Sequence, residues 1–154
     1  MDTMRVMRDA LVSGSLASVG STIALALAAR AEGKAALRPI NATSHWLHGD
    51  GAARHEAFDG AHTGVGYATN HAACLFWAFF FELWLAGRRR RGTPAMLQDA
   101  VVMSAVAAAV DYGPTPKRFT PGWELVLSRK GMAVAYGGLA LGLAAGALLT
   151  QSRR

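Results

Sequence analysis

The 154-residue sequence contains a single cysteine, Cys74. A lone cysteine excludes an internal disulfide, a CxxC redox pair and a cysteine-based zinc site. The sequence also lacks the HExxH signature of zinc proteases and the G-x-S-x-G signature of serine hydrolases. Its five histidines are fewer than His-rich membrane di-iron oxygenases typically use. The sequence therefore identifies no reaction, and we expect Cys74 to be a small packing residue.

Charged residues are absent from long stretches of the chain. Residues 10–29 and 131–150 contain none, and residues 62–86 contain no Arg, Lys, Asp or Pro and only one carboxylate, Glu82. At about 1.5 Å per residue, a helix of roughly 20 residues crosses a hydrocarbon core of about 30 Å. We predict one all-α domain over residues 1–154, a four-helix transmembrane bundle with short helical loops. The expected helices are at about 10–29, 62–86, 95–112 and 131–150.

The net charge of +6 arises from bases at the ends of the apolar runs, where they indicate membrane topology rather than nucleic-acid binding. The N-terminus, the Arg-rich turn at 87–94 and the C-terminus hold eight Lys or Arg in about 21 residues. The other two loops hold eight in about 50 residues. Because short Lys/Arg-rich segments stay in the cytoplasm, we expect both termini inside, in a bacterial inner membrane.

The first apolar run has two interpretations. Arg5 and Arg8 precede it and Ala-x-Ala patterns close it, which is also typical of a cleaved signal peptide. Its length, and the spacing of four between Gly14, Ser18 and Thr22, favour a retained membrane helix.

The fourth run contains a doubled GxxxG motif made of Gly138, Gly142 and Gly146. This spacing predicts close helix packing in an apolar segment. The contact is either internal or between protomers, so a homodimer is one possible assembly.

Histidines and carboxylates gather in the first loop. Imidazole and carboxylate ligands suit zinc, iron or copper, and a catalytic zinc needs three of them and an open position. HxxH alone is not specific, and loop histidines also serve as caps or lie exposed. The candidate metal ligands are His45, His48, His55, Asp59 and His62.

Ionisable groups inside the apolar runs form two candidate levels. If the Arg-rich turn at 87–94 makes an antiparallel hairpin, two residues lie at the same height along the paired helices when their numbers sum to about 181, the sum of 87 and 94. This arithmetic pairs His71 with Asp111 near the outer side, and Glu82 with Asp99 near the cytoplasmic turn. The outer pair is either a buried hydrogen-bonded pair that fixes the hairpin or part of a proton or ligand site.

The second loop is rich in proline. Thr120 and Pro121 match an N-cap and first helical position, so we expect a short interfacial helix over 121–130. Trp46, Tyr112 and Trp123 are expected at the outer interface, where aromatic side chains concentrate.

Three segments resemble small bacterial inner-membrane proteins of unassigned function. They are SHWLHGD at 44–50, HTGVGYA at 62–68 and DYGPTPKRFTPGWE at 111–124. The resemblance implies four spans and an inner-membrane location, and it brings no activity or cofactor.

Three hypotheses for function follow. The first is a membrane protein whose outward-facing His/Asp site binds a small ligand, lipid headgroup or divalent metal, or which serves as an accessory subunit. The second is a metal-dependent enzyme acting at the outer leaflet. The third is a proton-coupled transporter using His71, Asp111 and Glu82, which a 154-residue protomer would perform as a dimer. The lipid bilayer is the expected partner in all three.

Overall fold

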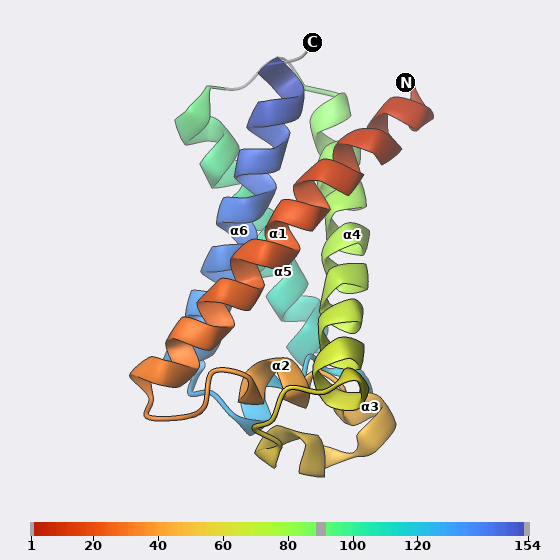
Figure 1. The fold of residues 1–154 in the computed structure, drawn as a ribbon. Coiled ribbons are helices and arrows are strands. Elements are labelled where there is room, and N and C mark those ends of the chain that lie inside the picture. Colours follow the sequence, from red (N-terminus) through yellow and green to blue (C-terminus); the bar gives the residue numbers. More distant parts are fainter. Residues whose placement is uncertain (1, 89–91, 153–154) are drawn as a thin grey trace.

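The computed structural model describes residues 2–88 and 92–152, and this part of the chain contains four long helices and no strand. The long helices are α1 (Thr3–Ala31), α4 (Val65–Ala86), α5 (Thr93–Tyr112) and α6 (Arg129–Ser152) (Figure 1). Both termini lie at one end of the bundle. The all-α prediction and its four main helices are confirmed. Residues 89–91 of the Arg-rich turn lie outside the described part.

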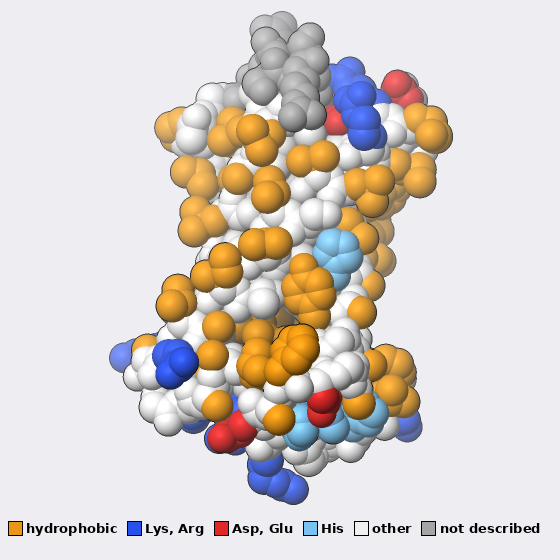
Figure 2. Space-filling model, in the orientation of Figure 1, with side chains coloured by type: hydrophobic (Ala, Val, Ile, Leu, Met, Phe, Trp, Pro, Cys, Tyr) orange, Lys and Arg blue, Asp and Glu red, His pale blue; other side chains and the backbone are white. Residues whose placement is uncertain are grey.

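The opposite end of the bundle carries two connecting segments, residues 32–64 and 113–128, which we call the cap. It contains only short elements: α2 (Arg38–Ala42), α3 (His45–His48), η1 (Asp50–Arg54), η2 (Gly60–Gly64), η3 (Lys117–Phe119) and η4 (Trp123–Leu125). On the face shown in Figure 2, hydrophobic side chains are spread over the surface between the two ends, and the Lys, Arg, Asp and Glu side chains lie toward the ends.

Within the described residues, three helices are long and apolar enough to cross a membrane: α1, α5 and α6. The expected fourth span forms a 22-residue helix, α4, but it is not among these three. Asn70, His71 and Glu82 are the reason, because each lowers the mean hydropathy of α4.

The helix α1 is the centre of the bundle, and its closest neighbour is α6. The three glycines of the doubled GxxxG motif face α1 within the same chain. A Cβ atom at Gly138, Gly142 or Gly146 would lie under 3.0 Å from backbone atoms of Gly20, Ala17 or Ser13, respectively. The two backbones are therefore in direct contact, which only the missing side chains permit.

The helix α4 packs on another part of α1. Leu75 contacts Gly14, and Asn70 Nδ2 donates to Ser21 Oγ at 3.1 Å. Cys74 is buried beside Ser21, with Sγ and Oγ 3.8 Å apart. The small residues of α1 thus allow a second helix, α4, to pack closely against it.

The helix α5 packs on α6 rather than on α4. Ser104 Oγ donates to the carbonyl oxygen of Tyr136 at 2.6 Å. The expected α4–α5 hairpin is therefore loose, because each of its helices finds a closer partner among the small residues of α1 and α6.

The expected helix over 121–130 is not present. Gly122 has a φ of +78°, a left-handed conformation that interrupts an α-helix, and only Trp123–Leu125 form a helical turn. The helix α6 begins at Arg129, and Ser128 Oγ accepts from the backbone N–H of Gly131 at 3.2 Å.

Glu32 fixes the start of α6 from the end of α1. Its carboxylate accepts from Ser128 Oγ at 2.6 Å and from Lys34 Nζ at 2.8 Å. These bonds, that of Lys34 above all, lower the pKa of Glu32 to about 2.

The glycine contact gives a direct prediction. Gly142→Ala places a methyl group against the backbone of α1 and should lower the free energy of unfolding by about 1–3 kcal/mol. Reversible unfolding in mixed micelles measures this difference.

Gly137→Ala is the matched control, because a Cβ at Gly137 meets no heavy atom within 4 Å. This variant should unfold like the wild type or with a stability higher by up to about 1 kcal/mol. Equal unfolding of both variants would contradict the close contact of α1 and α6.

Candidate functional site

The loop that carries His55, Asp59 and His62 is held by Asn41, a fully buried residue at the end of α2. Asn41 Nδ2 donates to the carbonyl oxygens of His55 at 2.8 Å and Ala57 at 3.1 Å. Asn41 Oδ1 accepts from Thr63 Oγ1 at 2.7 Å. One buried amide therefore fixes both ends of the loop.

Asp59 starts the helical segment that continues into α4. Its Oδ1 accepts from the backbone N–H of His62 at 2.6 Å, and its own N–H donates to Thr63 Oγ1 at 3.2 Å. This reciprocal capping directs the Asp59 carboxylate and the His62 ring to the same side.

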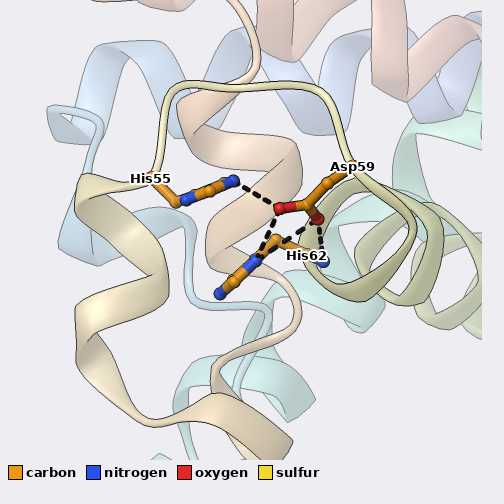
Figure 3. Close-up of side chains that lie close together, drawn as sticks. All are labelled: His55, Asp59 and His62. Carbon is orange, nitrogen blue, oxygen red and sulfur yellow. Dashed lines mark hydrogen bonds and ion pairs between the residues drawn. The ribbon is translucent and has the colours of Figure 1, made fainter.

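The three side chains converge on one point (Figure 3). Asp59 Oδ2 lies 2.7 Å from His55 Nε2 and 3.1 Å from His62 Nδ1. The two imidazole rings stack with centroids 4.0 Å apart. One ligand atom from each residue lies within 4.8 Å of the other two, as required of a shared metal ion.

Ligand atoms that lie within 4.8 Å of one another can be gathered around a small divalent cation. Zinc binds nitrogen and oxygen ligands at about 2.0–2.2 Å, so ligands in a tetrahedral site are about 3.4 Å apart. The contact from His55 to Asp59 is short but lacks the alignment of a hydrogen bond. The Nε2 atom of His55 is therefore not held in place by a hydrogen bond.

His48 lies beside this group. Its ring centroid is 4.7 Å from that of His62, and its Nε2 donates to the carbonyl oxygen of Ala61 at 2.9 Å. Because a carbonyl only accepts, Nε2 carries the proton and Nδ1 of the neutral ring keeps a free lone pair.

The environment of Asp59 keeps its carboxylate charged. The backbone N–H of His62 and, to a lesser degree, the imidazoles of His62 and His55 lower the pKa of Asp59 to about 2. The group thus offers a carboxylate that is ionised over the physiological pH range, beside two imidazole rings.

The structure does not bring His45 to this group. His45 is buried, its Nε2 donates to the carbonyl oxygen of Thr120 at 2.9 Å, and its Nδ1 lies 3.4 Å from Asp50 Oδ1. The HxxH spacing places His45 and His48 on one turn, but His45 packs toward the second connecting segment. His45 therefore joins the two parts of the cap.

The two members of the expected outer pair also have different neighbours. Asp111 Oδ2 accepts from the hydroxyl of Tyr136 at 2.6 Å. His71 Nδ1 is buried without a hydrogen-bond partner, and its ring stacks near that of Tyr67. Sequence reasoning missed Tyr136, although it is the one phenol within the uncharged run at 131–150.

Glu82 and Asp99 are both buried at the end that carries the termini, being 2% and 5% exposed. Arg88 Nη1 donates to Asp99 Oδ1 at 3.4 Å. A third carboxylate, Asp9, is fully buried at this end, 3.1 Å from Arg8 Nη2. The sequence did not predict the burial of Asp9, because this residue directly precedes the first apolar run.

No protein-family model matches the chain, and neither a curated protein nor a solved structure matches it. The resemblance in sequence pattern is supported only as far as a helical protein with three candidate membrane spans.

The capping role of Asp59 predicts a distinct acid titration. Its folded pKa of about 2 lies below the ordinary value of 3.8. Its contribution to loop stability is therefore complete above pH 3.8 and is lost as the pH falls toward 2. The amide resonance of His62, followed by NMR, should titrate with a midpoint near 2.

Asp59→Asn keeps a capping oxygen but removes the charge, so this titration should disappear from the His62 amide. A midpoint near 3.8 in the wild-type protein would contradict the capping geometry.

Proposed function

We propose that this chain is an integral protein of the bacterial inner membrane whose outward-facing cap binds one divalent transition metal ion, zinc first of all. The ligands are His55, Asp59 and His62, and the convergence of their side chains carries the proposal.

The helix α4 acts as the fourth span in this proposal. It packs along α1, with Asn70 and Glu82 buried against the bundle. Phe76 and Phe80 are 56% and 41% exposed, as suits residues that face lipid. Polar groups inside and aromatic groups outside are typical of a membrane helix in a bundle.

Four spans put both termini on one side of the membrane. The Arg-rich turn and the termini then face the cytoplasm, and the cap faces outward. This orientation exposes the His/Asp site to metal ions outside the cytoplasm.

The donor set favours zinc or another borderline transition metal over calcium or magnesium, which prefer oxygen ligands. Three protein ligands leave a position for water or a substrate, in contrast to the closed tetrahedral sites of structural zinc. His48 can fill that position through Nδ1 or act beside it. A metal-dependent reaction at the outer leaflet is compatible with an open position.

Calorimetric titration of the purified protein with zinc tests the proposal. One zinc ion per chain should bind, and magnesium should not compete. His55→Ala and His62→Ala should each weaken zinc binding by about tenfold or more, because each removes one of three ligands.

His71→Ala is the matched control, since it removes a histidine outside the group and should leave zinc affinity unchanged. Circular dichroism and thermal unfolding confirm that each variant is folded. Absence of stoichiometric zinc, or equal affinity in His55→Ala and His71→Ala, would contradict the proposal.

A further inference from the structure

A cavity of about 270 Å³ lies between α4, α5 and α6, beneath the cap. The helix α4 contributes Asn70 and Trp77, α5 contributes Asp111 and α6 contributes Tyr136. The cap closes it with Trp46 and Trp123. This volume is just below the roughly 300–1,000 Å³ of pockets for drug-sized ligands, so it suits a smaller molecule.

Three of the hydrogen-bond donors around the cavity are already used within the protein. Trp123 Nε1 donates to Thr43 Oγ1 and Trp46 Nε1 donates to Thr69 Oγ1, both at 3.1 Å. Asn70 Nδ2 donates to Ser21 Oγ on α1. The indole N–H groups of Trp46 and Trp123 are therefore engaged with threonine hydroxyls of the protein.

One acidic side chain lines the cavity together with these rings. Asp111 lines the cavity, and the described lining contains no Lys, Arg or His. Its Oδ2 accepts a hydrogen bond from the neutral hydroxyl of Tyr136, and no ion pair joins Asp111 to a base of the described residues. A carboxylate in apolar surroundings is costly unless it takes up a proton or a ligand supplies the compensating positive charge.

Aromatic faces and a carboxylate are together selective for one class of ligand. The ring faces carry partial negative charge and attract cations, most strongly those with weak hydration such as alkylammonium groups. The rings of Trp123 and Tyr136 are neighbours, with centroids 5.2 Å apart and planes tilted by 58°. An anion would meet the Asp111 carboxylate and, among the described residues of the lining, no Lys, Arg or His.

We propose that this cavity binds a small organic ammonium ion, with its nitrogen near Asp111 and its alkyl groups against Trp46, Trp77 and Trp123. The site is separate from the proposed metal site and does not depend on it.

Tryptophan fluorescence provides the readout, because three of the four tryptophans line the cavity. The purified protein is titrated with choline in the presence of EDTA, which keeps the metal site empty. Choline should change the fluorescence saturably. The neutral carbon analogue of choline, in which carbon replaces nitrogen, should bind at least about tenfold more weakly.

Asp111→Asn should weaken choline binding by about tenfold or more. Asp50→Asn is the matched control, because its carboxylate lies in the cap outside the lining of the cavity. Equal binding of choline and its neutral analogue, or wild-type affinity in Asp111→Asn, would overturn the proposal. If Asp111→Asn does not fold, the two ligands compared on the unaltered protein still decide it.

The ammonium group can come from a free molecule or from a lipid headgroup. Titrations in nanodiscs of phosphatidylglycerol and of phosphatidylcholine separate these sources. Weaker choline binding in phosphatidylcholine shows that the headgroup occupies the site, and equal binding assigns it to free ammonium ions.

Discussion

The direct contact between the backbones of α1 and α6 determines the arrangement of the other helices. Gly138, Gly142 and Gly146 remove the side chains that would separate the two helices, and α1 presents small residues in return. Because α1 also accepts α4 and α6 also accepts α5, the central pair sets where the outer helices lie. The helices α4 and α5 therefore pack on different partners and make little contact with each other, and the aromatic cavity lies between α4, α5 and α6 beneath the cap.

The cap combines two kinds of polar organisation. Buried groups such as Asn41 and His45 donate hydrogen bonds to backbone carbonyl groups of the connecting segments. Their role is to hold the segments in place. His55, Asp59 and His62 instead direct side-chain atoms at one another in a half-exposed position. Rigid support beneath a partly solvated donor group is the arrangement that metal binding requires. The proposed function depends on this division of roles.

The apolar runs and the charges between them predicted the long helices, because the length of an uncharged apolar run is close to the length of the helix that it forms. They also predicted a close contact at the glycine motif, although not that its partner is α1 of the same chain. Of the candidate ligands, His55, Asp59 and His62 come together, since Asp59 and His62 share one capping turn. Matching the heights of His71 and Asp111 failed to identify their neighbours. Residue counts along a hairpin give no information on helix tilt or on which helix packs closest, and Asp111 instead reaches Tyr136.

The central claim is that α4 crosses the membrane, so that the cap and the Arg-rich turn lie on opposite sides. Phe58, which is 81% exposed, and the exposed Thr93 lie on either side of this helix along the chain. Cysteines placed at these two positions, in a Cys74→Ser background, can be labelled with a membrane-impermeant maleimide in intact cells. The cysteine at position 58 should react before lysis and the one at position 93 only afterwards. Reaction of both before lysis, or of neither, would show that α4 does not span the membrane.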